Sequence, residues 1–138
     1  MTGIYQHTID TKGRLAIPAR LRDELGSAFH VTISMEKCLS AYSAESWDEL
    51  IKQVKAMPKP KQKRIRPLFS HAAKCEVDAQ GRILIPQNLR DFAGLKKNVS
   101  VVGAGDCVEF WDSDVWAEVD AIETTPENIA EVYMELDF

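Results

Sequence analysis

Long apolar runs are absent from this chain of 138 residues. No segment approaches the roughly 20 consecutive apolar residues that a membrane-spanning helix needs. The first ten residues lack the basic start and the apolar centre of a signal peptide, so we expect none there. With 45% hydrophobic and 28% charged residues, the composition is typical of a globular protein, and we expect it in the cytoplasm.

Residues that bind metals are also scarce. The only cysteines are three widely separated ones without a C-x-x-C pair: Cys38, Cys75 and Cys107. An odd number of cysteines without an export signal predicts reduced, mostly buried thiols. The three histidines are isolated and lack the H-x-x-x-H or H-E-x-x-H spacing of a zinc site. We therefore expect no metal site.

Signatures of catalysis are missing as well. The sequence has no G-x-S-x-G elbow for a nucleophilic serine. The segment Gly103-Ala104-Gly105 matches the start of a dinucleotide-binding fingerprint, but Val108 stands where the third glycine belongs, and a β-turn explains the segment better. We expect neither a cofactor nor enzymatic activity, and a small double-barrel enzyme stays as an alternative.

Lysine and arginine are absent from residues 106–138, which hold 11 acidic side chains. Residues 1–105 contain all 17 basic and 10 acidic residues, so their net charge is +7, although the whole chain carries −4. This split indicates a basic surface that could meet phosphate and an acidic end that faces elsewhere. A solvated acidic helix beside a neutral body would explain the charges equally well.

What the sequence does contain is an internal repeat. Residues 9–26 recur as residues 77–94, at an offset of 68, with nine of 18 positions identical. The similarity continues after one inserted residue, since Cys38 and Trp47 match Cys107 and Trp116. Two copies are too few for a solenoid, which needs at least about three repeats. The repeat therefore predicts a pseudo-twofold pair of modules that share one core.

Each copy predicts a strand, a turn, a second strand and a short helix. Gly13 and Gly81 stand in polar turns where a positive φ is expected, and Gly26 and Gly94 fit helix C-caps. Further strands and a closing amphipathic helix follow in each copy. These strands are expected near residues 31–34, 39–42, 99–102 and 108–111, and the helices near residues 43–56 and 112–122.

The segment between the copies is strongly basic. From Lys52 to Arg66 it has seven basic residues and no acidic one, which suits either a solvated face or a helix that flanks a DNA-contacting surface. Pro67 predicts an end or a kink of this helix near Arg66. The resulting division is a first repeat over 1–51, a basic connecting helix over 52–70, a second repeat over 71–122 and an acidic C-terminal helix over 123–138.

The paired D-x-x-x-R segments, Asp10 to Arg14 and Asp78 to Arg82, each run into an Ile-Pro and a Leu-Arg. In this arrangement they resemble the signature of the MraZ family over nearly the whole chain. The resemblance implies an α+β fold related to the AbrB-type swapped-hairpin barrel, with short flanking helices. It also implies a nucleoid-associated ring of identical subunits that binds tandem promoter repeats and chiefly represses its own division and cell-wall gene cluster.

The candidate DNA contacts lie in and beside the repeated loops. A guanidinium can bind phosphate or the O6 and N7 edge of guanine, and a two-stranded ribbon fits the major groove. Lysine would add phosphate contacts that fix the register. Alternatively, the aspartates simply pair with the arginines to fasten the turns, and the two roles are compatible. The set comprises Asp10, Lys12, Arg14, Arg20, Asp78, Gln80 and Arg82, whereas Arg22 and Arg90 are expected to brace the modules.

Another class of function stays open: a barrel-type antitoxin or a purely scaffolding ring. Antitoxins usually pair one short DNA-binding module with a disordered tail that wraps the toxin. Here Ile122, Ile129, Val132 and Leu136 are spaced to form one helix face instead. This favours a self-contained regulator whose partners are double-stranded DNA and further copies of the chain, with no membrane.

Overall fold

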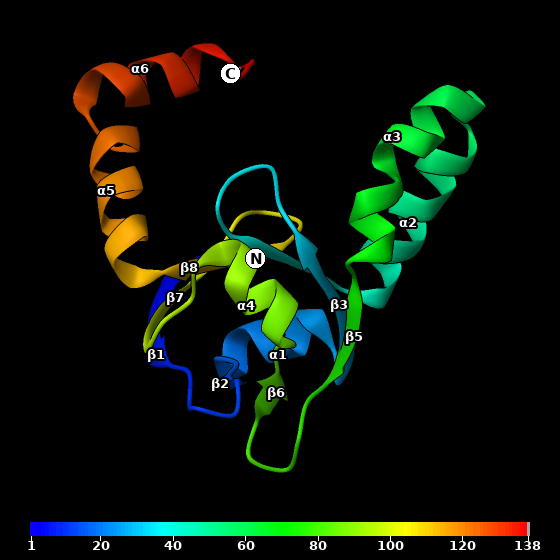
Figure 1. Cartoon of the computed structure of the whole chain (residues 1–138). Helices are drawn as coiled ribbons and strands as arrows, with labels where there is room; N and C mark the ends of the chain where they lie inside the picture. Colours follow the sequence, from blue (N-terminus) through cyan, green and yellow to red (C-terminus); the bar gives the residue numbers. More distant parts are fainter. Residues whose placement is uncertain (138) are drawn as a thin grey trace.

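A computed structural model describes residues 1–137, so Phe138, the end of the expected acidic helix, lies outside the described residues. Within the described range the chain forms eight strands and six helices (Figure 1). No helix in this range is both long and apolar enough to cross a membrane. The α+β class with flanking helices, predicted from the sequence, is confirmed.

The two copies of the repeat have the same order of elements. In the first copy these are β1 (Ile4–Thr8), β2 (Arg14–Ala16), α1 (Ala19–Leu25), β3 (Ala28–Ile33), β4 (Leu39–Tyr42) and α2 (Ala44–Lys55). After α3 (Lys59–Ser70), the second copy contains β5 (Ala73–Glu76), β6 (Arg82–Leu84), α4 (Gln87–Ala93), β7 (Asn98–Gly103), β8 (Val108–Asp112) and α5 (Ser113–Glu123). The chain continues into α6 (Pro126–Met134).

The capping residues explain where the helices begin and end. Ser43 caps α2 by accepting a hydrogen bond from the backbone N–H of Ser46 at 3.2 Å, and Asp112 caps α5. Gly26 and Gly94 form the C-caps of α1 and α4, as predicted, and both have a positive φ.

Each of the two sheets combines strands from both copies of the repeat. The larger sheet has the order β1-β7-β8-β4-β3-β5, and all its pairs are antiparallel. Strand β1 therefore pairs with β7 of the second copy, and β5 pairs with β3 of the first copy. The pseudo-twofold axis passes between β4 and β8, where Leu39 is opposite Phe110. The second sheet consists only of β2 and β6, one strand from each copy.

The larger sheet is not closed into the barrel that the family resemblance implied. Its edge strands are β1 and β5, and the chain turns away from the sheet after each of them. The following strands, β2 and β6, then pair with each other instead of extending the sheet. Because β2 and β6 form hydrogen bonds with each other, they do not bridge the edge strands β1 and β5, and the larger sheet stays open.

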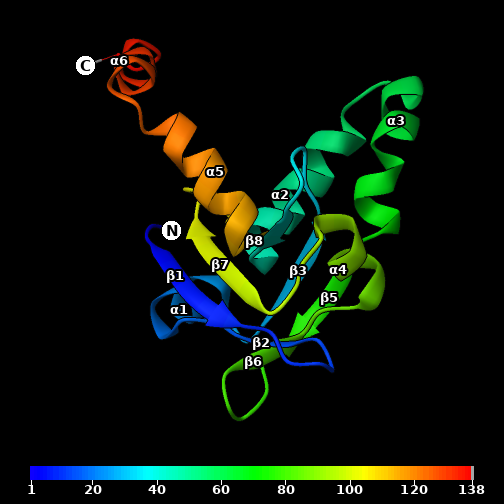
Figure 2. The ribbon, with the colours of Figure 1, turned by 60° about the vertical axis from the view of Figure 1, so that its left-hand side comes forward.

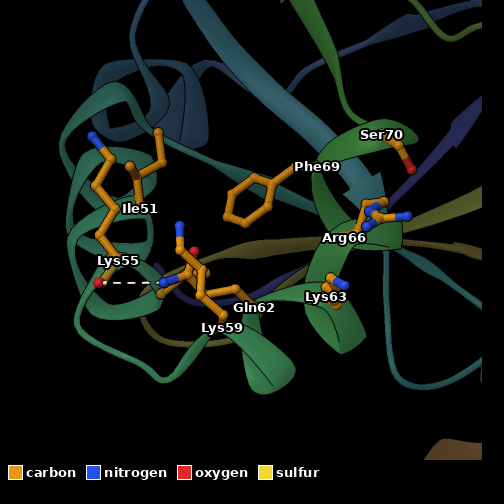
Figure 3. Close-up of a pocket in the computed structure, with 9 residues that line it drawn as sticks. Ile51, Lys55, Lys59, Gln62, Lys63, Arg66, Phe69 and Ser70 are labelled. Carbon is orange, nitrogen blue, oxygen red and sulfur yellow. Dashed lines mark hydrogen bonds between the residues drawn. The ribbon is translucent and has the colours of Figure 1, made fainter.

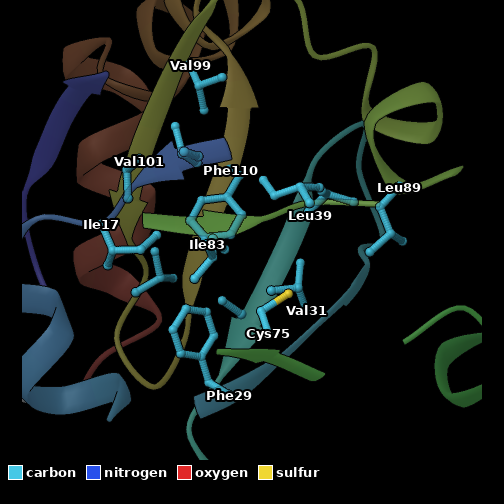
Figure 4. Packing of buried hydrophobic residues seen from close by; sticks show 14 of the residues in the cluster. Ile17, Phe29, Val31, Leu39, Cys75, Ile83, Leu89, Val99, Val101 and Phe110 are labelled. Atoms are coloured by element: carbon cyan, nitrogen blue, oxygen red, sulfur yellow. The ribbon is translucent and has the colours of Figure 1, made fainter. Parts of the chain in front are cut away.

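One hydrophobic core joins both copies. Leu15, Phe29, Ile83 and Phe110 are buried at its centre and come equally from the two copies. Figure 4 shows side chains from β3, β4, β7 and β8 converging with those of Ile17, Ile83 and Leu89. Full burial of such a side chain stabilises a fold by about 1.5–3 kcal/mol. Neither copy could bury these groups alone.

The three cysteines are free and buried, as predicted. Burial raises the pKa of the Cys38 thiol to about 12, and the pKa values of Cys75 and Cys107 to about 11. Since the thiolate is the reactive form, these residues act as small apolar side chains rather than as nucleophiles.

The sequence predicted an end or a kink of the helix near Arg66, and the end is wrong, because α3 continues through Pro67 to Ser70. Proline in a helix interior removes one hydrogen bond and costs about 3 kcal/mol or more. Contacts with the body offset this cost. Phe69 packs edge-on against Trp47 with ring centroids 5.5 Å apart, and Thr32 Oγ1 donates a hydrogen bond to the Leu68 carbonyl at 2.6 Å.

Candidate nucleic-acid interface

The exchanged strands bring the two D-x-x-x-R loops together. Strands β2 and β6 pair so that Leu15 is opposite Ile83 and Ala16 is opposite Arg82. Each strand directly follows one of the loops, and because the strands are antiparallel, the loops flank the two ends of this short ribbon. Both loops lie at the same end of the molecule (Figures 1 and 2). Two segments that are 68 residues apart in the sequence therefore form one surface.

In the first loop the Asp10 side chain organises the backbone. Its Oδ1 accepts hydrogen bonds from the backbone N–H groups of Lys12 at 3.0 Å and Arg14 at 2.9 Å. The N–H of Gly13 donates to the Asp10 carbonyl at 3.0 Å, which closes a tight turn. Gly13 has a φ of 90°, a conformation that L side chains rarely adopt.

The second loop repeats this construction. Asp78 Oδ1 accepts hydrogen bonds from the backbone N–H groups of Gln80 and Arg82, both at 2.9 Å. The Gly81 N–H donates to the Asp78 carbonyl at 3.0 Å, and Gly81 has a φ of 78°. Both predicted positive-φ turns are therefore confirmed.

The aspartates also hold the two arginines. Arg14 Nε lies 2.7 Å from Asp10 Oδ2, and Arg82 Nε lies 3.4 Å from Asp78 Oδ2. Arg82 additionally contacts the side-chain oxygen of Gln80, and its Nη1 lies 3.9 Å from Asp10 Oδ2. Asp10 thus links both loops. The Arg14 and Arg82 side chains are 37% and 29% exposed, so solvent still reaches them.

Hydrogen bonding lowers the pKa of both aspartates. For Asp10 the main cause is the backbone N–H of Arg14, followed by opposing desolvation and then by the Arg14 side chain. For Asp78 the main cause is the backbone N–H of Arg82. A carboxylate that accepts such bonds is favoured in its charged form. Both loops therefore keep ionised aspartates at neutral pH, which can hold the guanidinium groups in place.

Each loop is braced by the other copy. The Ile85 N–H donates to the Gly13 carbonyl at 2.8 Å, and the Ile17 N–H donates to the Gly81 carbonyl at 2.9 Å. The Arg90 guanidinium covers Gly13 so closely that an added Cβ would lie 2.8 Å from it, and Arg90 Nε donates to the Ile85 carbonyl at 3.0 Å.

Arg22 covers Gly81 in the equivalent way, since a Cβ there would lie 2.7 Å from Arg22 Nη1. The structure therefore supports the expected bracing role of Arg22 and Arg90. Each arginine supports the loop of the other copy rather than that of its own.

The surroundings of the two loops differ in charge. Lys96 and Lys97 line the same pocket as Asp10 and Thr11, and the Ile9 N–H donates to the Lys97 carbonyl at 2.8 Å. Beside the second loop the corresponding pocket holds Asp23 and Ser27 together with Asp78. The first loop, which also carries Lys12, is therefore the more basic one.

Sequence reasoning missed Lys96 and Lys97 as phosphate-contact candidates. They stand more than 80 residues after the first loop, and only the exchanged pairing brings them next to it. No local signal in the sequence marks them, because the pairing of β1 with β7 of the other copy is visible only in the structure.

Two other predicted basic features lie apart from the paired loops. Arg20 is exposed near the start of α1, and none of the hydrogen bonds or ion pairs found in residues 1–137 ties it to the loops. The basic segment between the copies runs along α2 and α3, whose far ends point away from the loops (Figures 1 and 2). It does not flank them.

No group of three or more His, Cys, Asp or Glu side chains within residues 1–137 is placed to hold a metal ion. What the loops present is a pair of oriented guanidinium groups on a narrow two-stranded projection.

Comparison with known proteins agrees with the repeat. The family model described as "MraZ protein, putative antitoxin-like" matches residues 1–65 and again residues 68–128. The chain is 44% identical over 133 residues to the transcriptional regulator MraZ of Acetivibrio thermocellus, which covers 94% of this chain and 93% of that protein.

Two further relatives carry the same name. The protein of Heliobacterium modesticaldum is 43% identical over 139 residues, covering 98% of this chain and 97% of the relative. The protein of Caldicellulosiruptor bescii is 39% identical over 133 residues, covering 94% of this chain and 90% of the relative. Such long matches span both copies of the repeat.

Proposed function

The chain belongs to the MraZ family, whose named relatives are transcriptional regulators rather than enzymes, and we propose that it regulates transcription by binding double-stranded DNA through its two loops. The observation that carries the proposal is the side-by-side placement of Arg14 and Arg82, each held by an aspartate, on one projection. We further propose that it acts on the nucleoid as a repressor of its own division and cell-wall gene cluster.

The residues in and beside the loops have different roles in the proposed DNA binding. Arg14 and Arg82 enter the major groove, where a guanidinium can bind the O6 and N7 atoms of guanine in a bidentate manner. Lys12 in the first loop and Lys96 beside it bind phosphate, which fixes register without reading sequence. The proposed contact set is completed by Asp10 and Asp78, which orient the arginines, by Gln80, which contacts Arg82, and by Arg20 as an outlying phosphate contact.

The two-loop surface of one subunit is small for a specific operator. Several subunits joined in a closed ring would present the same loops at regular intervals to tandem promoter repeats. Linked contacts raise overall affinity by 10² to 10⁴ without any new contact when the geometry permits simultaneous binding. A ring of identical subunits is therefore part of the proposal.

One alternative has a specific observation behind it. The family model's description includes the words "putative antitoxin-like", which keeps an antitoxin role open. Copurification of a stoichiometric protein partner with the tagged chain would favour this alternative, whereas a scaffolding ring would bind neither DNA nor a toxin.

The proposal is tested by fluorescence anisotropy of a duplex from the chain's own upstream region and of a scrambled duplex, across a salt series. The upstream duplex is expected to bind more tightly, and log affinity should fall with log salt by about 0.9 per phosphate contact. Arg14→Ala should weaken binding by about 1–3 kcal/mol, as expected for one bidentate base contact.

Arg64→Ala on α3 is the matched control, because it removes the same side chain far from the loops, and its affinity should stay near that of the wild type. Equal binding of both duplexes together with an unchanged Arg14→Ala variant would contradict recognition through the loops.

A further inference from the structure

We propose that α6 of one subunit docks into the groove between α2 and α3 of a second copy of the chain, so that subunits join head to tail. The inference rests on the ring assembly proposed above and identifies the two surfaces that form it. Each surface is present once in every subunit.

The receiving surface is an apolar groove with a basic rim (Figure 3). It has a volume of about 490 Å³, and its apolar lining comes from Ile51, Val54 and Phe69. Gln62 on α3 donates hydrogen bonds to the Lys55 carbonyl at the end of α2, at 3.5 Å, and to the Met57 carbonyl in the connecting turn, at 2.8 Å. The groove is therefore formed by a helix pair that is tied together in the isolated subunit.

The rim of this groove has no anionic partner within the subunit. Its charged residues are Lys55, Lys59, Lys63 and Arg66. None of the ion pairs found in residues 1–137 involves a basic residue of the segment 52–66. An acidic amphipathic helix would both fill the apolar groove and neutralise its rim.

The chain itself carries such a helix in α6. The preceding helix, α5, is anchored to the body where Val115, Trp116 and Val119 pack against Trp111. Helix α6 has no buried residue, and its substantial contacts with other elements are limited to α5. It extends from the body as an arm (Figure 1).

The arm has one apolar side and one acidic side. On α6, Ile129 and Val132 are 38% and 46% exposed, and their spacing of three residues places them on one helical face. Leu136, which is 53% exposed, follows just after the end of α6, whereas Ile122 lies on α5, so the single helix face expected from the sequence is divided between two helices. Glu127 and Glu131 lie on the other side of α6, and residues 106–138 contain no Lys or Arg. The arm thus complements the groove in both polarity and charge.

The positions of the two surfaces favour a second copy as the partner. In both views α5 and α6 lie on one side of the body, and α2 and α3 lie on the other (Figures 1 and 2). A contact between different surfaces of identical subunits is heterologous, and it generates a ring when the rotation closes. The helices α5 and α6 and the helices α2 and α3 all extend away from the D-x-x-x-R loops, so this contact leaves the loops free for DNA.

Sedimentation velocity of matched variants tests the docking. Ile129→Glu places a charge in the apolar face of the arm, and Lys59→Glu/Lys63→Glu reverses the charge of the rim. Each change should weaken self-association at least 10-fold relative to the wild type. The controls add the same charges outside the proposed contact: Ala130→Glu beside the apolar face of α6, and Lys61→Glu/Arg64→Glu on α3 outside the groove lining. Both controls should assemble like the wild type.

Mixing the two defective variants gives the sharper result. Ile129→Glu retains an intact groove, and Lys59→Glu/Lys63→Glu retains an intact arm, so one functional interface can form between them. An equimolar mixture should therefore produce a heterodimer and no larger species. Far-UV circular dichroism of each variant should match that of the wild type, which shows that the loss is one of assembly and not of folding.

The outcomes separate this inference from the proposed function. An oligomeric wild type whose arm and groove variants assemble normally would overturn the docking while leaving the ring and DNA binding in place. A monomeric wild type at micromolar concentration would overturn both the ring and the docking. Anisotropy on a duplex with a single operator repeat tests the loops independently, and the docking predicts that Ile129→Glu binds this duplex like the wild type.

Discussion

At the scale of single residues, Asp10 determines how the paired loops present charge. It accepts two backbone hydrogen bonds, binds Arg14 Nε and lies 3.9 Å from Arg82 Nη1. Fastening the turn and orienting the arginine are therefore one arrangement rather than two competing roles. Because only Nε of Arg14 is bound by Asp10, the terminal nitrogens of its guanidinium keep their donors for a ligand.

Gly13 provides a prediction at this scale. In Gly13→Ala the new Cβ would have an unfavourable φ of 90° and would lie 2.8 Å from both the Arg90 guanidinium and the Ile85 carbonyl. Gly105→Ala is the matched control, since Gly105 has a φ of 91° but no atom within 4 Å of an added Cβ.

The left-handed conformation should cost both variants about 1–2 kcal/mol. Overpacking should destabilise Gly13→Ala by about a further 1–3 kcal/mol, and urea unfolding of the two variants measures the difference. Equal losses would mean that Arg90 moves aside without cost and does not brace the loop.

At the scale of elements, α3 shows how tertiary contacts override a local signal. Pro67 cannot donate the backbone hydrogen bond that an interior helical position requires, yet the helix reaches Ser70. The contacts of Leu68 and Phe69 with β3 and α2 hold the last turn in place.

Pro67→Ala should therefore stabilise the protein. The substitution restores an N–H that can donate to the carbonyl four residues earlier, while the added freedom of the unfolded chain offsets about 0.4–1 kcal/mol of the gain. We expect a net gain of about 2–2.5 kcal/mol in chemical denaturation.

Pro60→Ala is the control, because Pro60 stands in the first turn of α3, where no hydrogen bond from its nitrogen is needed. Its effect should stay within about 0.5 kcal/mol. A destabilised Pro67→Ala variant would show instead that the proline's shape is needed at this position.

At the scale of the whole molecule, the two copies cannot be separated. Strands β1, β2 and β3 of the first copy pair with β7, β6 and β5 of the second, and the core draws on both. The acidic C-terminal segment and the basic segment 52–66 lie on helices on opposite sides of one body (Figure 1).

A fragment of residues 1–70 should consequently fail to fold as a monomer. It would retain α3 but would leave β1, β2 and β4 without their partners from the second copy. Circular dichroism should show no cooperative thermal transition for this fragment, and mixing it with residues 71–138 should restore one.

The full chain is the reference, and its far-UV and fluorescence transitions should coincide, as expected for two-state unfolding. Cooperative unfolding of the isolated monomeric fragment would contradict the shared core.

Several features of the fold and the site follow from local sequence. Gly13 and Gly81 mark positive-φ turns, Ser43 marks a helix start, and Gly26 and Gly94 mark helix ends, because each depends on the conformational preferences of one residue. The pairing of each aspartate with its arginine is also local, since the two residues are four positions apart. The repeat itself indicated two equivalent modules.

Only the tertiary structure decided which copy pairs with which and what surrounds each loop. The repeated sequence does not reveal that strands pair between the copies. Each strand has the same residues available whether its partner belongs to its own copy or to the other one. The open sheet, the crossed bracing by Arg22 and Arg90, and the approach of Lys96 and Lys97 to the first loop all follow from that pairing between copies. These contacts join residues that are far apart in the sequence, such as Arg22 and Gly81, and long-range packing rather than local propensity determines them.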